Sequence, residues 1–328
     1  MKIKIPLLLV ISLLWLFISC SSRSSSPVSI IFDTDMGPDY DDVGALAVLH
    51  SLADKGEANI LATVSSNRFT YAVPCIELIN TYFNRPYLPL GAPGKGPYVL
   101  DSRPQVWPDS LVTNYPHTIR STADAPDAVD VYRRILSVQP DASVNIITVG
   151  FLTNLAALLH SPADRHSELD GKALVKKKVR RLYSMAGRFP HGREFNVFSD
   201  TLASITVFNE WPTPVLLSGY EIGREIMTGL RLVASDIQNS PIKDAFRICL
   251  KVDVDGRESW DQVTVLVGVR GTQKYFDTVV GRMTVLPDGS NTWEDDPNGP
   301  HEHIVWKMPK EELTYLIEDL MMHQPHQP

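Results

Sequence analysis

The feature that most constrains the fold is an acidic stretch between an apolar strand and an apolar helix. Residues 28–32 are mainly apolar and predict a buried strand. Five aspartates then follow within ten residues: Asp33, Asp35, Asp39, Asp41 and Asp42. From Val43 onward the apolar residues recur at helical spacing. A strand that ends in polar residues and leads into a helix is typical of open α/β sheets, which bind ligands at the carboxyl ends of their strands.

The number of carboxylates in this stretch indicates a metal site. Aspartates so close together repel one another strongly unless a cation neutralises them. One or two of them could act as helix N-caps, but five are more than capping requires. Carboxylate oxygens are the ligands that Ca²⁺ and Mg²⁺ prefer. The stretch therefore predicts a site for a hard divalent cation.

The rest of the chain alternates strand-like runs with helical segments. The expected strands are residues 58–64, 87–90, 144–149, 182–185, 215–219, 275–286 and 303–307. The expected helices are residues 75–83, 127–138, 155–159, 200–209, 242–250, 263–269 and 310–322. This alternation predicts an α/β fold with an open, mainly parallel central sheet flanked by helices, in a single domain.

Three segments do not fit the alternation. Residues 91–124 are rich in glycine, proline, aspartate and serine and predict a long, partly ordered loop. Residues 186–199 predict a second loop. Residues 174–181 carry five basic side chains, for which a solvated face is expected rather than a binding patch.

Composition and charge limit the classes of partner. The chain has 328 residues, of which 44% are hydrophobic, so it is long enough for a large core. Its net charge of −7 argues against a nucleic-acid partner, which needs a basic face. Cys75 and Cys249 are too few for a disulfide framework and are expected to be small buried side chains.

The first 28 residues predict export and lipid anchoring. Lys2 and Lys4 precede an apolar run, residues 6–18, that is too short to span a bilayer comfortably. The following Ser19-Cys20 resembles the end of a bacterial lipoprotein cleavage box. We therefore expect a signal peptide at 1–19, a lipidated Cys20 with a serine-rich tether at 20–28, and one domain at 29–328. The alternative is a plain secretory signal with an incidental cysteine. The expected location is the cell envelope, with membrane contact only through Cys20.

Further polar motifs lie where other predicted strands end or helices begin. Gly150-Phe-Leu-Thr-Asn154 follows one strand, Glu194-Phe-Asn196 with Asp200 comes later, and Trp260-Asp261 precedes a helix. Together with the acidic stretch, and in this order, they resemble the inosine-uridine-preferring nucleoside hydrolase family over residues 29–322. The resemblance implies a Ca²⁺-dependent hydrolase that splits the N-glycosidic bond of ribonucleosides into ribose and base.

The resemblance also implies roles for individual residues. Asp35 would be the general base that removes a proton from water, and Asp33 would hold the loop together. The implied metal ligands are Asp35, Asp42, Asp261 and the backbone carbonyl of Val149. The implied substrate-binding residues are Asp41, Asn67, Met185, Glu194, Asn196, Trp260 and Asp261.

Two departures from the family pattern leave alternatives open. Family members read Asp-x-Asp-x-Gly-x-Asp-Asp, whereas Asp39 and Tyr40 are two extra residues here, so Asp39 is an alternative ligand. Trp260 stands where some members have a histidine proposed to protonate the leaving base. Tryptophan cannot supply a proton at neutral pH, but it could stack on the base or be an ordinary core residue. His191 and His117 are other candidate donors, or ordinary surface histidines.

Other functions remain as rivals to the hydrolase. Asp33-Thr-Asp35 after a strand also resembles phosphatases of the haloacid dehalogenase type, although the remaining motifs argue against that class. A non-catalytic lipoprotein that binds ribosides or sugars is a second rival, and a hydrolase of another N-riboside is a third. The expected partner is a small-molecule nucleoside, and a homo-oligomer is left open beside a monomer.

Overall fold

The computed structural model describes residues 26–37, 39–97, 99 and 106–325. The predicted signal peptide, Cys20 and most of the tether lie outside these residues and stay predictions. Within the described ranges, no helix is both long and apolar enough to cross a membrane.

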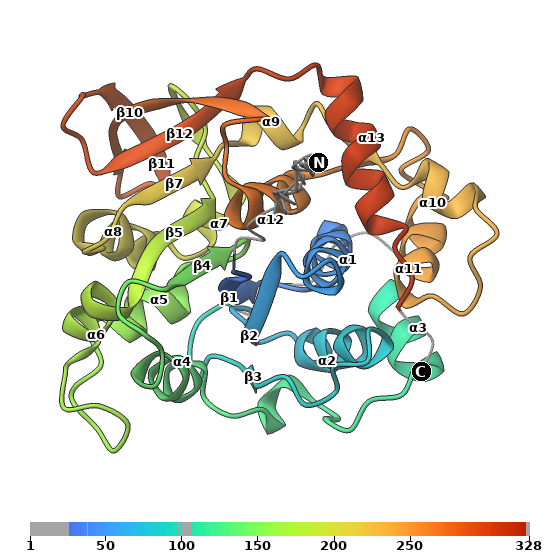
Figure 1. Ribbon diagram of the computed structural model, residues 1–328, viewed down its shortest axis with the longest axis horizontal. Coiled ribbons are helices and arrows are strands. Elements are labelled where there is room, and N and C mark those ends of the chain that lie inside the picture. The colour runs from blue at the N-terminus through green and yellow to red at the C-terminus, as the bar shows by residue number, and fades with distance from the viewer. Residues whose placement is uncertain (1–25, 38, 98, 100–105, 326–328) are drawn as a thin grey trace, which may run out of the picture.

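A mixed sheet forms the centre of the molecule (Figure 1). Its strand order is β3-β2-β1-β4-β5-β7-β12-β10-β11-β6. The strands are β1 (Val28–Thr34), β2 (Ala58–Ser65), β3 (Leu90–Gly91), β4 (Val144–Thr148), β5 (Val179–Met185), β6 (His191–Arg193), β7 (Val215–Ser218), β10 (Phe276–Val285), β11 (Ser290–Asp295) and β12 (His301–Trp306). Pairing is parallel from β3 to β12 and antiparallel from β12 to β6. The short strands β8 (Met227–Thr228) and β9 (Arg257–Glu258) pair separately.

Helices cover both faces of the sheet (Figure 1). They are α1 (Asp41–Asp54), α2 (Ala72–Tyr82), α3 (Trp107–Asn114), α4 (Ala128–Ser137), α5 (Thr153–Leu159), α6 (Gly171–Lys178), α7 (Phe195–Ser199), α8 (Thr201–Glu210), α9 (Tyr220–Gly223), α10 (Leu230–Ala234), α11 (Pro241–Cys249), α12 (Trp260–Arg270) and α13 (Lys310–Met321). In β1, Ile30 and Phe32 belong to the core shared with α1 and α12, whereas Ile31 belongs to the core shared with α4, α5 and α8. The strand is thus apolar on both faces, as expected for a parallel sheet between two helical layers.

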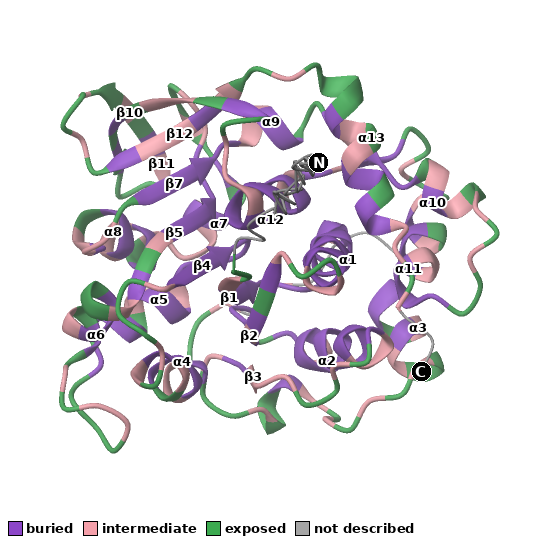
Figure 2. Cartoon of the chain, in the orientation of Figure 1, coloured by how far each residue is buried: buried purple, intermediate pink, exposed green. Residues whose placement is uncertain are grey.

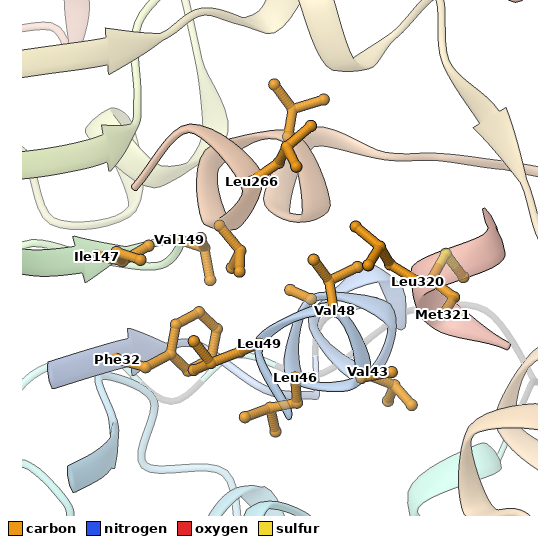
Figure 3. Close-up of a cluster of buried hydrophobic side chains, with 14 of the residues drawn as sticks. Phe32, Val43, Leu46, Val48, Leu49, Ile147, Val149, Leu266, Leu320 and Met321 are labelled. Carbon is orange, nitrogen blue, oxygen red and sulfur yellow. The ribbon is translucent and has the colours of Figure 1, made fainter. Parts of the chain in front are cut away.

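Helix α1 is buried along most of its length (Figure 2). Its apolar side chains meet Phe32 of β1 on one side and Leu320 and Met321 of α13 on another (Figure 3). A helix that is apolar on nearly all sides must be enclosed by other elements. The helix that begins with two of the predicted site aspartates is therefore held firmly in the core.

The predicted fold class is confirmed, but the prediction missed several short elements. Outside the two predicted loops these are α6, α9, α10, β8, β9 and β11. Residues 91–124 contain α3, which buries Trp107 and Leu111 one helical turn apart. The surrounding glycines and prolines favour a loop, so the sequence pattern did not predict this short helix. Residues 186–199 contain β6 and α7. Cys75 and Cys249 are buried and free, as expected, and Lys176 and Lys177 are exposed on α6.

Candidate active site

The carboxyl ends of the central parallel strands lie side by side at one edge of the sheet. Pairing aligns Thr34 of β1 with Ser65 of β2, and Thr148 of β4 with Ser184 of β5. Residues just beyond these strand ends therefore meet at the same edge. This register brings together motifs that lie more than a hundred residues apart in the chain.

A cavity of about 530 Å³ opens at this edge. Its lining includes eight of the predicted site residues: Asp35, Asp41, Val149, Met185, Glu194, Asn196, Trp260 and Asp261. Asp42 is buried and lies next to Asp39 and Asp41. Asn67 is not part of the lining, because its amide bridges the backbone carbonyls of Asp35 and Val99. The cavity has the size of a typical small-molecule site.

The floor of the cavity is strongly acidic. Asp39, Asp41 and Asp42 each place one carboxylate oxygen within 4.8 Å of the others. Burial, and next the repulsion between neighbouring carboxylates, raises the pKa of Asp35 and of Asp261 well above the usual value. An assembly of this kind favours protons or a bound cation.

Arg257 of β9 enters this acidic cluster. Its guanidinium lies 2.5 Å from a carboxylate oxygen of Asp39 and 3.1 Å from one of Asp41. One arginine cannot balance the charges of the five aspartates at positions 35, 39, 41, 42 and 261. The second oxygen of Asp41, Oδ2, is buried and has no hydrogen-bond partner among the described residues. An unpartnered buried oxygen in an all-oxygen donor set fits a hard divalent cation.

Asp33 anchors the start of the acidic loop through buried hydrogen bonds. Its carboxylate accepts hydrogen bonds from the Tyr132 hydroxyl at 2.9 Å and from Asn154 Nδ2 at 3.1 Å. Burial raises the pKa of Asp33 to about 7, although these hydrogen bonds oppose the shift. Asp33 is not among the lining residues, consistent with the predicted role of holding the loop together.

Gly150 explains how the turn after β4 approaches the acidic loop. A Cβ at this position would lie 2.4 Å from the Asp35 backbone nitrogen and 2.6 Å from Ser66 Oγ. Only glycine leaves room for this contact. The motif that begins at Gly150 therefore brings the Val149 carbonyl close to Asp35, while Asn154 at its other end binds Asp33.

The wall formed by α7 is held by a buried network. Glu194 caps α7 by accepting hydrogen bonds from the backbone N–H groups of Asn196 at 2.8 Å and Val197 at 3.2 Å. Burial raises the pKa of Glu194 to about 7. Asn196 Nδ2 donates to the carbonyl of Val149 at 2.9 Å and to that of Met185 at 3.2 Å. A carbonyl has two lone pairs, so Val149 can accept this bond and still bind a cation.

Trp260 lines the cavity, and its indole N–H group already forms a hydrogen bond within the protein. Its Nε1 donates to the Tyr220 carbonyl at 2.8 Å, and the two rings stack with centroids 5.4 Å apart. Gly223 makes room for this placement, because a Cβ there would lie 2.3 Å from the Trp260 Cα. His191 and His117, the other candidate proton donors, are not among the lining residues.

Sequence reasoning missed several residues of the cavity. The lining also includes Arg188, Arg193, Phe195, Tyr220 and Arg257. Arg193 and Arg257 stand close to predicted motifs in the chain, but no spacing rule distinguishes such an arginine from a surface one. Their positions depend on the loops that follow β5 and β7 and on the β8–β9 pair.

Comparisons with known proteins identify the family and the fold of the chain. The sequence profile described as inosine-uridine preferring nucleoside hydrolase matches residues 30–298. A plant nucleoside hydrolase, PpNRh1, has a similar structure, with a TM-score of 0.68 and 20% identity over 90% of this chain and 99% of that chain. The inosine-uridine preferring nucleoside hydrolase from Bacillus anthracis gives a TM-score of 0.70 and 16% identity over 90% of this chain and 99% of that chain. The type III effector protein XopQ, in complex with adenosine diphosphate ribose, gives a TM-score of 0.67 and 14% identity over 92% of this chain and 95% of that chain. At such identities the structures establish the fold alone, and no curated protein sequence matches the chain.

Proposed function

Because the chain belongs to the inosine-uridine preferring nucleoside hydrolase family, we propose that it is a Ca²⁺-dependent N-ribohydrolase. It would split ribonucleosides into ribose and a free base. The observation that carries this proposal is one cavity in which the buried aspartates and the α7 wall face the same space. Within the cell, we propose a lipid-anchored protein of the envelope, attached through Cys20.

The acidic cluster supplies the donors that a calcium ion needs. Asp35, Asp42, Asp261 and the carbonyl of Val149 would hold it, with Asp39 or Asp41 as a further carboxylate. When bound there, Ca²⁺ would lower the pKa of a coordinated water and orient the sugar hydroxyls. The support for this ion is the donor chemistry together with the unpartnered Asp41 Oδ2.

The protein's own residues would carry the remaining steps. Asp35 lines the cavity and would take the proton of the attacking water while the N-glycosidic bond breaks. The surrounding carboxylates would stabilise the positive charge that develops on the ribose ring. Glu194 and Asn196 lie on the α7 wall and would contact ribose hydroxyls. Trp260 would lie against the base.

The lack of a proton donor for the leaving group supports a second candidate function. Trp260 cannot donate a proton, and no histidine lines the cavity within the described residues. This favours leaving groups that depart without protonation, as in an N-riboside other than inosine or uridine. It also favours a non-catalytic riboside-binding lipoprotein as the second candidate function.

The deciding experiment measures ribose release by the purified protein. Inosine, uridine and p-nitrophenyl riboside are each incubated with Ca²⁺ and with a chelator. We expect chelator-sensitive cleavage, with p-nitrophenyl riboside cleaved best because nitrophenolate needs no proton. Calcium binding without cleavage of any riboside would overturn the hydrolase in favour of the binding protein.

The general base is tested by Asp35→Ala. We expect turnover to fall by about 10²–10⁴-fold or more, because removing a positioned base costs about that much. Asp124→Ala, at an exposed aspartate outside the cavity, is the matched control and should retain activity. Circular dichroism and calcium binding establish that the variant is folded and loaded. Normal turnover by such a variant would contradict the assignment of Asp35.

A further inference from the structure

The cavity that contains the acidic floor also has two arginines on its wall. Arg188 and Arg193 both lie between β5 and α7 and both line the cavity. In the described ranges neither takes part in an ion pair, in contrast to Arg257 on the floor. The chain as a whole carries a net charge of −7, so this pair is a local positive feature and not part of a basic face.

Arg188 is held in place along its whole length. Its backbone N–H donates to Asn291 Oδ1 at 2.9 Å, and Asn291 Nδ2 donates back to its carbonyl at 2.9 Å. Its side-chain stem crosses Gly192, where a Cβ would lie 2.5 Å from the Arg188 Cδ. Its guanidinium carbon lies 4.4 Å from the centroid of the Tyr220 ring. The guanidinium N–H groups form no hydrogen bond to any described residue, so they remain available to a ligand.

Arg193 is positioned in a similar way. Its Nε donates to the Asp288 carbonyl at 3.1 Å, and its guanidinium carbon lies 4.0 Å from the centroid of the Phe198 ring. The side chain is therefore ordered by a hydrogen bond and a ring contact, although it is exposed. Its terminal N–H groups form no hydrogen bond to any described residue.

Two positioned guanidinium groups that form no ion pair within the described residues suit an anion. Carboxylates are close to both, because the charge of Arg188 acts to lower the pKa of Glu221 and that of Arg193 acts to lower the pKa of Asp288, but neither carboxylate forms an ion pair with its arginine. Guanidinium binds phosphate with paired, charge-assisted hydrogen bonds. A neutral nucleoside has no group that needs two such cations. An anion would be repelled by the acidic floor, so it would bind at the arginine wall while the ribose lies toward the aspartates.

We propose that Arg188 and Arg193 form a phosphate subsite, so that the preferred substrates are ribosides that carry a phosphate group. This inference rests on the proposed function, because it assumes that ribose occupies the cavity floor. The cavity of about 530 Å³ has room for a phosphate beyond the sugar and base.

The first arm of the test measures binding, which does not require catalysis. Ribose 5-phosphate and ribose are titrated into the Ca²⁺-loaded protein by calorimetry. We expect ribose 5-phosphate to bind at least about tenfold more tightly than ribose, because one hydrogen bond to a charged group lowers Kd by about tenfold. The advantage should shrink as the salt concentration rises. Equal affinities for the two sugars would overturn the subsite.

The second arm measures substrate preference with matched variants. The ratio of kcat/KM for p-nitrophenyl riboside 5′-phosphate to that for p-nitrophenyl riboside should fall about tenfold in Arg188→Gln. In Arg188→Lys, which keeps the positive charge, this ratio should fall less. Arg180→Gln is the control, because Arg180 is an exposed arginine outside the cavity whose Nε donates to the Ala142 carbonyl at 3.2 Å. An equal ratio in Arg188→Gln and Arg180→Gln would overturn the proposal.

The two proposals can fail separately. Cleavage of p-nitrophenyl riboside without any preference for phosphorylated ligands overturns the phosphate subsite alone. Tight binding of ribose 5-phosphate without cleavage of any riboside supports the subsite and overturns the hydrolase.

Discussion

At the scale of single residues, Trp260 determines what its part of the cavity lining can offer a ligand. Its indole N–H is already bonded to the Tyr220 carbonyl, so it offers a flat apolar surface and no free donor. A tryptophan at this point can therefore offer a ligand surface contact but no proton. The structure places it against Tyr220 in the cavity lining, which gives the predicted stacking role a geometric basis.

This role is testable by substitution. Trp260→Ala should raise KM for purine ribosides about fivefold, because ring stacking contributes about 1 kcal/mol beyond burial. A riboside with a small, non-aromatic leaving group should be affected less. Trp260→Phe keeps part of the stacking surface and serves as the conservative variant. If KM rises equally for both substrates in Trp260→Ala, Trp260 does not stack on the base.

His50 gives a prediction about stability that is independent of the cavity. Burial, and next the charge of Arg85, lowers the pKa of His50 from 6.5 to about 3. His50 therefore stays neutral in the folded chain, while the unfolded chain takes up a proton below pH 6.5. Its contribution to stability is complete above pH 6.5 and is lost as the pH falls toward 3.

We expect this contribution to decline by about 1.4 kcal/mol per pH unit below 6.5. His50→Gln should make the free energy of unfolding less dependent on pH in this range. Urea unfolding at about pH 7.5 and about pH 5.5 measures the difference for both proteins. His301, whose pKa burial lowers to about 4, adds a similar slope to both. The same slope in the wild type and in His50→Gln would show that His50 is not the source.

At the scale of elements, the site depends on how strand ends and helix starts meet. The first turns of α1 and α12 carry acidic residues at the sheet edge, where the partial positive charge of a helix N-terminus favours carboxylates. The turn from β4 to α5 approaches the same point from the other side. Gly150 is the residue on which this close approach depends.

Gly150→Ala should therefore disturb the acidic loop directly. The new Cβ would meet the backbone of Asp35, and backbone cannot move aside cheaply. We expect a loss of about 1–3 kcal/mol in unfolding free energy, together with weaker calcium binding. Gly94→Ala is the matched control, because the nearest atom to a Cβ there is 3.6 Å away. Equal stability and calcium affinity in the two variants would contradict this account of the turn.

At the scale of the whole molecule, the aspartates form a cluster only when the chain is folded. Asp261 and the acidic loop are separated by more than two hundred residues. In the unfolded chain they cannot bind one cation together, so a cation that binds them must stabilise the fold. It would also relieve the repulsion among buried carboxylates.

Calcium should accordingly raise the melting temperature. At a free concentration of about 100 times Kd, the gain in unfolding free energy should be about 2.7 kcal/mol. Thermal unfolding with Ca²⁺, with Mg²⁺ and with a chelator measures both the gain and the choice of metal. Asp42→Asn should reduce the gain. Identical melting temperatures with calcium and with the chelator would exclude a calcium site in this cluster.

The sequence by itself determined the parallel α/β fold and most of the acidic floor. Both follow from local patterns, because apolar runs that end in Asp33–Asp42 or at Val149 must place polar groups at the strand ends. Only the tertiary structure decided that three arginines line the cavity. Arg188, Arg193 and Arg257 are functional candidates because of contacts with Asn291, Phe198 and Asp39, all made by folding. A charged side chain has no periodic signal of its own, so its role depends on which distant segments the fold brings to it.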